Sequence, residues 1–266
     1  MRWRPAYYAA RVNARGSIRS LAQRTGNAHR LQSLQEALRR YAEYRNARDD
    51  AALLAVMTSV LRRDSCCVDI GANEGAVLRQ MLRLAPEGRH YAFEPLEDLA
   101  ARLSTAFPAV EVRNVALADR TGQAQFMRRA ESALSSLETV PDGEDPETWR
   151  GPILDDARRA TVEVRRLDDE LPADYVPSLI KIDVEGVEDA VLAGAHQTIA
   201  KHRPVLAIEH SIGATHHGYA AGGIHDVLNE CGLRIFDAEW RGPYSRQELA
   251  RTVLEGKIWF YFAFPA

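Results

Sequence analysis

Short apolar runs alternate with amphipathic segments over the last three quarters of the chain. The runs have the length of buried strands, and the segments between them place apolar residues at helical spacing. Strands are predicted at residues 65–70, 90–94, 110–116, 123–128, 161–167, 179–183, 204–209, 233–236 and 257–264. Helices are predicted at 76–84, 96–106, 187–202 and 222–231. This alternation predicts a mainly parallel sheet with helices on both faces, and the last two strands predict an antiparallel edge.

The N-terminal segment has a different pattern. Two helices are expected there, one within 28–48 and one over 49–61 that begins with Asp49 or Asp50 as its N-cap. Residues 1–48 contain eleven arginines and two acids, a net charge of +9 against −12 for the remainder. We therefore expect an Arg-rich helical prefix over 1–62 and a main domain over 63–266. The prefix is either a packed, solvated helical layer or a lid or docking surface, and its helices offer one route to a homo-oligomer.

Composition narrows the class of protein. Apolar residues make up 46% and charged residues 27%, as in ordinary globular proteins, and the net charge of −3 favours neither nucleic acid nor an anionic membrane. The three cysteines have no framework spacing, and Cys67 is expected in the core, which favours a reducing compartment. No run approaches the ~20 apolar residues of a membrane helix. We expect a cytoplasmic protein.

The sequence VDIGANEG, residues 68–75, stands where a strand ends and a helix begins. Gly71 permits a tight turn and a close approach of a ligand to the backbone, and the free N–H groups after it favour a polar ligand. The spacing is GxxxG and not the dinucleotide pattern GxGxxG. Asp69 beside the turn suits a ligand with a positively charged amino group. The alternative is a glycine turn with a structural role only.

The ends of the next two predicted strands carry residues that suit the ribose and the adenine of a nucleoside. Glu94 follows the next strand and suits the two hydroxyls of a ribose, as in nucleotide-binding folds. The segment NVALAD begins at Asn114, and an adenine there would lie against Ala116 and Leu117. Since ligands of open α/β sheets bind at the carboxyl ends of strands, these groups predict one adenosyl pocket.

These segments resemble the FkbM family of S-adenosylmethionine-dependent methyltransferases. The resemblance covers about residues 65–265 and rests on VDIGANEG, FEP, NVALAD, LIKIDVEGVEDAVLAGA and PVLAIEH. It implies a class I, Rossmann-like α/β fold with a seven-stranded, mostly parallel sheet. It also implies methyl transfer to a hydroxyl of a small molecule, sugar or natural product. By this resemblance Glu94 binds the ribose, Asn114 and Ala116 border the adenine, and the methionine end is lined by Asp69, Gly71, Asn73 and Gly75.

Three residues at later strand ends are candidates for catalysis. Asp183 is expected beside the methyl group of the cofactor, and Glu209 and His210 follow the next strand. His210 could accept the hydroxyl proton, because histidine is the side chain that changes its charge near cellular pH. The same three residues could instead bind Mg²⁺ or Mn²⁺, an arrangement similar to catechol-type O-methyltransferases except that His210 stands where those have an amide. Alternatively, Asp183 or Glu185 caps the helix that begins near Val187.

Other candidates and rival functions carry less weight. His216 and His217 precede a Gly-rich stretch and either line the acceptor site or are simply solvated. Three aromatic residues either stack on a sugar or pack: Trp149, Trp240 and Tyr244. A nicotinamide-dependent oxidoreductase is disfavoured by the glycine spacing, and a non-catalytic adenosyl-binding module by the intact acids. A nucleic-acid substrate is disfavoured as well, since no Asn-Pro-Pro-Tyr base pocket is present.

Overall fold

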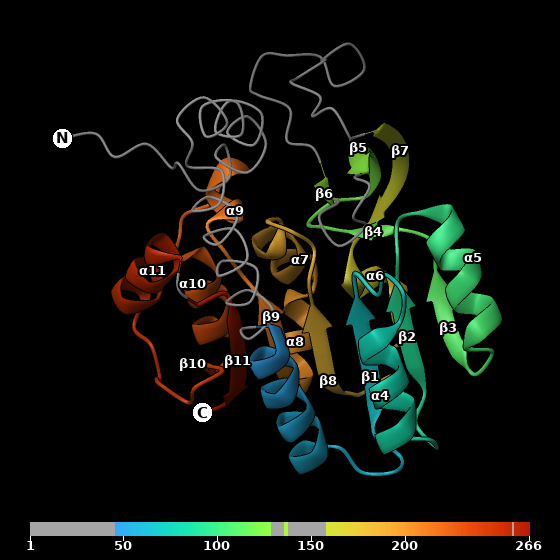
Figure 1. Cartoon of the computed structure of the whole chain (residues 1–266), viewed down its shortest axis with the longest axis horizontal. Helices are drawn as coiled ribbons and strands as arrows, with labels where there is room; N and C mark the ends of the chain where they lie inside the picture. Colours follow the sequence, from blue (N-terminus) through green and yellow to red (C-terminus); the bar gives the residue numbers. More distant parts are fainter. Residues whose placement is uncertain (1–45, 129–135, 138–157, 257) are drawn as a thin grey trace, which may run out of the picture. The chain divides into compact units, whose positions relative to one another are not determined.

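The structure is a computed structural model that describes residues 46–128, 136–137, 158–256 and 258–266 (Figure 1). Its contacts divide the chain into residues 1–51 and residues 52–266. In the first unit, the described residues 46–51 are helical. The second unit contains both sheets and all the candidate site residues that the structure describes. The predicted boundary at residue 62 stays a prediction.

A seven-stranded sheet forms the centre of the second unit. Its order is β10-β11-β9-β8-β1-β2-β3, and only β11 runs antiparallel to its neighbours. The strands are β1 (Cys66–Ile70), β2 (His90–Phe93), β3 (Val110–Arg113), β8 (Pro177–Ile182), β9 (Val205–Glu209), β10 (Leu233–Asp237) and β11 (Phe260–Pro265). This confirms the predicted Rossmann-like α/β fold. The antiparallel strand is not at the edge, because β11 lies between β9 and β10.

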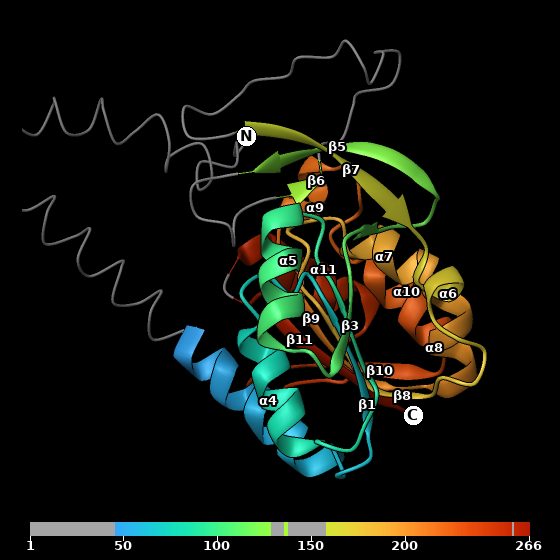
Figure 2. The same ribbon diagram turned by 90° about the vertical axis from the view of Figure 1, so that its right-hand side faces the viewer.

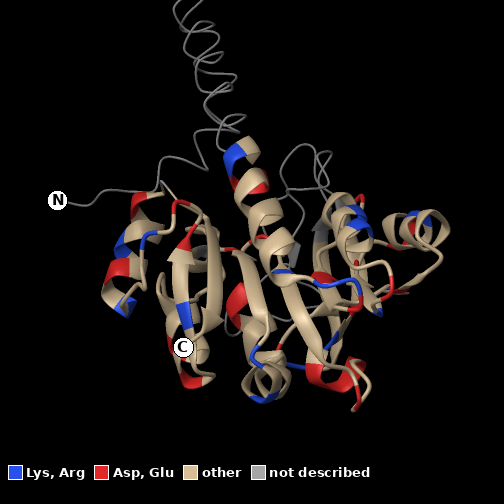
Figure 3. Cartoon of the chain, turned by 90° about the horizontal axis from the view of Figure 1, so that it is seen from below, with Lys and Arg blue, Asp and Glu red and all other residues tan. Residues whose placement is uncertain are grey.

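Helices cover both faces of this sheet, as the edge-on view in Figure 2 shows. On one face lie α7 (Glu188–Gly194), α8 (His196–His202), α10 (Gly223–Glu230) and α11 (Arg246–Glu255). On the other lie helical residues 52–60, α4 (Ala76–Leu84) and α5 (Glu97–Ala106). Successive residues of β11 pack against opposite helical layers: Tyr261 lies in the core beneath α7, α8, α10 and α11, whereas Phe260 and Phe262 lie in the core on the other face of the sheet. Charged residues stand mainly on the helices and loops around the sheet (Figure 3).

A second, four-stranded sheet lies beyond the carboxyl ends of the central strands (Figures 1 and 2). Its order is β4-β7-β5-β6. The strands are β4 (Ala116–Leu117), β5 (Gly122–Arg128), β6 (Ser136–Leu137) and β7 (Arg158–Arg165). The sequence pattern predicts strands near β5 and β7 but no separate sheet. It also predicts a loop over 131–159, in which the structure places β6 and the start of β7; the rest of that loop lies outside the described residues.

The helices differ from the prediction at several points. Residues 46–60 are continuously helical, so the predicted N-cap at Asp49 or Asp50 is wrong. The helix predicted over 187–202 is broken at Ala195 into α7 and α8. Gly194 ends α7 against β4, where an added Cβ would collide with the carbonyl oxygen of Ala118. The sequence prediction misses three helices: α6 (Leu167–Glu170), α9 (Gly213–His216) and α11.

The structure confirms that Cys67 lies in the hydrophobic core. Cys67 is fully buried on β1, and all three cysteines are free. Among the described residues, no helix combines the length and the apolar character needed to cross a membrane.

Candidate active site

Gly71 brings three central strands together at their carboxyl ends. It follows β1 and has a φ of +74°, a conformation that side chains other than glycine rarely adopt. An added Cβ would collide with the carbonyl oxygen of Asp183, just after β8. The backbone N–H of Gly71 donates to the carbonyl of Phe93 at 3.0 Å. The glycine therefore fixes the approach of β1, β2 and β8 at this edge.

Gly75 has a packing role. It is the N-cap of α4 with a φ of +76°, and an added Cβ would run into the side chains of Leu103 and Phe107 near the end of α5. The family resemblance implies a place for Gly75 at the cofactor. In the structure, this glycine allows α4 to begin against α5.

Glu94 is held rigidly after β2. Its two carboxylate oxygens accept hydrogen bonds from the backbone N–H groups of Asn73, at 2.9 Å, and Leu96, at 3.0 Å. The side chain is buried, and this burial raises the pKa of Glu94 above its ordinary value. Each oxygen keeps a lone pair for a further donor, as a ribose hydroxyl requires.

A cavity opens at this edge of the sheet. Five residues predicted for the cofactor line it: Gly71, Asn73, Glu94, Ala116 and Asp183. Phe126 of β5 also lines it, so the second sheet forms part of its wall.

Asn114 and Asp69 lie outside the lining of this cavity. The exposed Asn114 donates through Nδ2 to the carbonyl oxygens of Glu94, at 2.9 Å, and Pro95, at 3.0 Å. It therefore holds the turn that carries Glu94. Asp69 is fully buried within β1, with neither carboxylate oxygen hydrogen-bonded.

Lys181 is the residue here to which the sequence analysis assigned no role. It is buried on β8, with Nζ 3.1 Å from Asp183 Oδ2, 3.2 Å from the carbonyl oxygen of Gly71 and 3.6 Å from Asp69 Oδ1. Burial lowers the pKa of Lys181, but the charges of Asp183 and Asp69 outweigh it and raise the pKa above the ordinary value. The lysine thus stays charged and orients Asp183. The sequence does offer a pattern from which this role could be predicted: one lysine within an apolar strand, shortly before Asp183 and Glu185.

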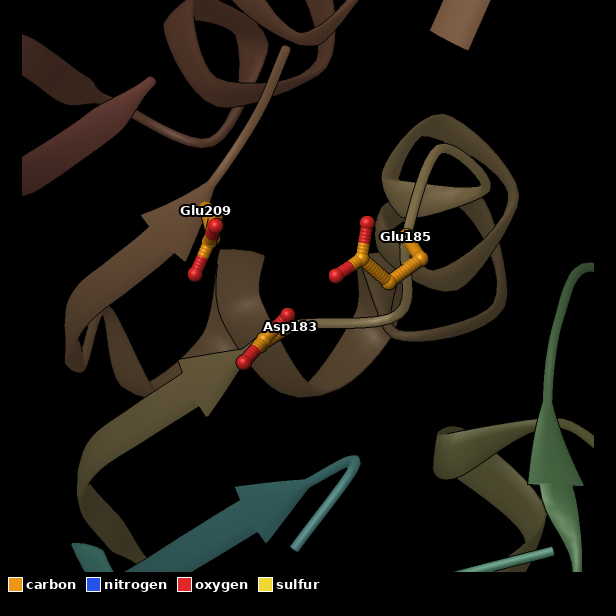
Figure 4. A group of neighbouring side chains, drawn as sticks. All are labelled: Asp183, Glu185 and Glu209. Carbon is orange, nitrogen blue, oxygen red and sulfur yellow. The ribbon is translucent and has the colours of Figure 1, made fainter. Parts of the chain in front are cut away.

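Three carboxylates meet where β8 and β9 end. The side chains of Asp183, Glu185 and Glu209 each place an oxygen within 4.8 Å of the others (Figure 4). Glu185 reaches this position through a φ of +56°. Burial and the charges of Asp183 and Glu185 raise the pKa of Glu209 well above its ordinary value. Asp183 and Glu185 also line the cavity, whereas Glu209 lies outside its lining.

His210 does not join the acid cluster. Its ring is fully buried, and Nδ1 lies 3.3 Å from Oε2 of Glu188. Successive residues at the end of a strand point to opposite faces, so Glu209 and His210 turn in different directions. Glu185 takes the place that the sequence analysis predicts for His210. The capping alternative is wrong as well, because α7 has Val187 as its N-cap and no side-chain cap.

The remaining candidates lie elsewhere or pack. His217 contacts the turn at Gly186, and nothing is described for the His216 side chain. Trp240 stacks on Phe262, with ring centroids 5.7 Å apart, and Tyr244 donates to Asp237 Oδ2 at 2.7 Å. These two aromatic residues serve packing and the loop after β10. Trp149 lies outside the described residues.

Comparison with known proteins settles the family. The profile of the methyltransferase FkbM domain matches residues 69–235, which include the cavity and the acid cluster. The chain belongs to the FkbM methyltransferase family. It is also 32% identical to the 2-O-methyltransferase NoeI of Sinorhizobium fredii (strain NBRC 101917 / NGR234), over 197 residues that cover 65% of this chain and 75% of NoeI. The resemblance inferred from the sequence is confirmed.

Solved methyltransferase structures match the chain at low identity. The FkbM methyltransferase of Methylobacillus flagellatus KT matches with a TM-score of 0.45 and 20% identity, over 77% of this chain and 44% of that one. A TehB-like methyltransferase of Corynebacterium glutamicum matches with a TM-score of 0.43 and 12% identity, over 85% of this chain and 96% of that one. The chain thus spans less than half the length of the Methylobacillus protein. The FkbM family is a family of methyltransferases, and the roles of single residues stay predictions.

Proposed function

We propose that this FkbM family member transfers a methyl group from S-adenosylmethionine to a hydroxyl of a carbohydrate or other small-molecule acceptor. The observation that carries the proposal is the position of the acid cluster. Asp183 and Glu185 line the same cavity as Glu94, and Glu209 lies beside these two acids, with carboxylate oxygens within 4.8 Å of one another. One cavity thus combines a ribose-type carboxylate with a group that can accept a proton.

The cavity suits S-adenosylmethionine in its chemistry. Glu94 would accept hydrogen bonds from the ribose hydroxyls, and Ala116 and Leu117 offer an apolar surface to the adenine. The turn at Gly71 and Asn73 lies at the carboxyl end of β1, where open α/β sheets bind their ligands. The cofactor supplies an already reactive methyl sulfonium. The protein has to align an oxygen in line with the transferred methyl, exclude water and remove a proton.

Glu209 is the candidate general base. A carboxylate with a raised pKa is a stronger base than an ordinary one, and burial and its acidic neighbours raise the pKa of Glu209. Asp183, held by Lys181 at 3.1 Å, is oriented to accept a hydrogen bond from the acceptor hydroxyl. His210 is not in this group, so the role of base that the sequence predicts for it passes to Glu209.

A divalent cation is the second route to the same step. Oxygen ligands are those that Mg²⁺ and Mn²⁺ prefer, and Asp183, Glu185 and Glu209 can offer one each. Such a cation would lower the pKa of a hydroxyl bound to it. Lys181 already neutralises part of the charge of Asp183, which weakens the cluster as a metal site.

The name of a relative and the charges of the acid cluster support a proposal for the acceptor class. NoeI is named as a 2-O-methyltransferase. Hydroxyl groups donate well to carboxylates, and three carboxylates facing one lysine repel phosphate groups. We therefore propose an acceptor hydroxyl on a sugar, without an anionic group beside it. A cytoplasmic location and a homo-oligomer remain predictions.

Calorimetry tests the cofactor assignment first. The metal-stripped protein is titrated with S-adenosylhomocysteine, with and without Mg²⁺, and with NAD⁺ as the control for the oxidoreductase alternative. We expect the protein to bind S-adenosylhomocysteine and not to bind NAD⁺. No binding in either condition would contradict the proposal.

A screen of neutral methyl glycosides and oligosaccharides, with radiolabelled S-adenosylmethionine as the donor, then tests transfer. Phosphorylated sugars are the matched negative controls. Turnover abolished by EDTA and restored by Mg²⁺ would establish the metal route, and turnover indifferent to EDTA would exclude it. Cofactor binding without transfer to any acceptor would favour the non-catalytic binding module.

A further inference from the structure

Glu188 joins the two chain segments that carry the acid cluster. It is the first residue of α7 and is 1% exposed. Its Oε1 accepts a hydrogen bond from the backbone N–H of Gly186 at 2.7 Å, and its Oε2 lies 3.3 Å from Nδ1 of His210. Gly186 belongs to the loop after β8, and His210 directly follows β9. One buried carboxylate therefore ties together the ends of the two strands that position Asp183, Glu185 and Glu209.

The loop that Glu188 holds is conformationally strained. Glu185 has a φ of +56° and Gly186 a φ of +107°. A residue other than glycine adopts this left-handed conformation only where its surroundings impose it. The only side-chain hydrogen bond described for the Gly186 N–H is the one to Glu188. Without that bond, the turn would relax toward ordinary backbone angles and take the Glu185 carboxylate away from Asp183 and Glu209.

The other end of the tether is anchored in the sheet. The backbone N–H of His210 donates to the carbonyl oxygen of Trp259 at 2.6 Å, so His210 continues the pairing of β9 with the segment before β11. Its ring is fully buried, which leaves it little freedom to move. A hydrogen-bonded pair in such a desolvated place fixes geometry well. His210 is thus a rigid point against which Glu188 holds the strained loop.

We propose that Glu188 is a positioning residue that sets the gap between Glu185 and Glu209, with His210 as its anchor. The length of the Glu188 side chain matters here more than its charge, because one carboxylate oxygen must reach the Gly186 N–H while the other reaches Nδ1 of His210. The consequence for turnover rests on the proposed function. The consequence for the loop itself does not, and it can be measured without an acceptor.

Two substitutions separate reach from charge. Glu188→Asp keeps the charge but shortens the side chain, so one carboxylate can no longer span Gly186 and His210. Glu188→Gln keeps the length, and its amide can accept from the Gly186 N–H and donate to Nδ1 of His210. The control is Glu97→Asp, because Glu97 is also the first residue of a helix but is exposed. Thermal unfolding first checks that each variant folds.

Amide hydrogen exchange of the peptide that spans residues 183–188 gives the readout independent of activity. We expect Glu188→Asp to speed exchange there at least tenfold, and Glu188→Gln and Glu97→Asp to stay within threefold of the wild type. Unchanged exchange in Glu188→Asp would overturn the tether. Equal acceleration in both Glu188 variants would overturn the reach argument.

Turnover with the acceptor found in the glycoside screen gives the second readout. We expect Glu188→Asp to lower kcat about 10–100-fold, as misplaced groups do, with the affinity for S-adenosylhomocysteine unchanged. In a Glu185→Gln background the same change should add less than a threefold loss, since the two residues act as one unit. Fully additive losses would mean that Glu188 does not act through Glu185. A wild type without any transfer would instead contradict the proposed function and leave the exchange result standing.

Discussion

Single residues at the strand ends decide what the site can do. Lys181 contacts both Asp183 and Asp69 from inside the sheet, so it keeps the buried Asp69 from being an isolated charge. Burial still raises the pKa of Asp69 above its ordinary value, although Lys181 opposes the effect. The lysine thus links the strand that begins the Gly-rich turn to the residue that lines the cavity.

Glu94 should govern the affinity for the cofactor. We expect Glu94→Gln to weaken binding of S-adenosylhomocysteine about 10–100-fold, because hydrogen bonds to a charged group contribute about 1.5–3 kcal/mol. Calorimetry measures the change, with Glu111→Gln on the exposed side of β3 as the control. An affinity equal to that of the wild type would remove Glu94 from the ribose site.

Glu209 should govern turnover. We expect Glu209→Gln to lower kcat by about 10²–10⁴-fold, the range of a lost general base, while binding of S-adenosylhomocysteine stays within threefold. Single-turnover kinetics with the identified acceptor measures the chemical step. His210→Asn should leave binding of the cofactor unchanged as well. A rate near that of the wild type for Glu209→Gln would show that another group removes the proton.

Asp237 predicts a pH dependence of stability away from the site. Its carboxylate accepts hydrogen bonds from Tyr244 Oη at 2.7 Å, from Arg241 Nε at 2.8 Å and from the backbone of Glu239 and Arg241. Burial alone would raise the pKa of Asp237, but these bonds outweigh it and lower the pKa below its ordinary value. The stabilisation is therefore complete above the unfolded-state pKa of about 3.9 and is lost as the pH falls through the lower folded-state pKa.

Urea unfolding of Asp237→Asn and of the wild type at pH 6 and pH 3 measures this effect. We expect the substitution to cost about 2–3 kcal/mol at pH 6 and clearly less at pH 3, where the wild type begins to lose the same bonds. An equal difference at both values would contradict the assignment.

At the scale of elements, several features were open to prediction and others were not. The helix α11 begins with a capping box of Ser245 and Glu248, an S-x-x-E pattern that the sequence displays. The separation of Glu209 from His210 follows from the two-residue period of a strand. The arrival of Glu185 in the acid cluster requires a left-handed backbone, and the break at Ala195 accompanies the close approach of Gly194 to Ala118, just after β4. Such tertiary contacts leave no local pattern.

Among the glycines that join a strand to a helix, Gly71 should be the one whose substitution lowers the stability of the fold most. Gly71→Ala places a Cβ against the carbonyl oxygen of Asp183 and imposes a strained φ, so we expect a loss of more than about 3 kcal/mol of unfolding free energy. Gly218→Ala is the matched control, because Gly218 also has a positive φ but has space around it. It should cost about 1–2 kcal/mol. Denaturant unfolding of both variants tests the difference, and equal losses would exclude the collision.

At the scale of the whole molecule, periodicity was enough to predict the central sheet. Strands such as β1 and β8 are apolar because helices bury both of their faces, and that pattern is visible in the sequence. The four-stranded sheet was harder, since β4 and β6 have two residues each and take their structure from pairing with β7 and β5. Sequence analysis thus named strand-end residues that line the cavity but missed the sheet that supplies part of its wall.

The position of β11 has a consequence for how the chain reaches its native state. Residues 260–265 pair with β9 on one side and with β10 on the other, and Phe260 lies opposite Glu209. During synthesis β9 and β10 therefore leave the ribosome well before the strand that fills the gap between them. Until then both strands present unpaired backbone edges, a template for aggregation. β9 can pair with β8 early, but its other edge, beside Glu209, stays open until β11 has emerged, so we expect the nascent chain to depend on chaperones until then.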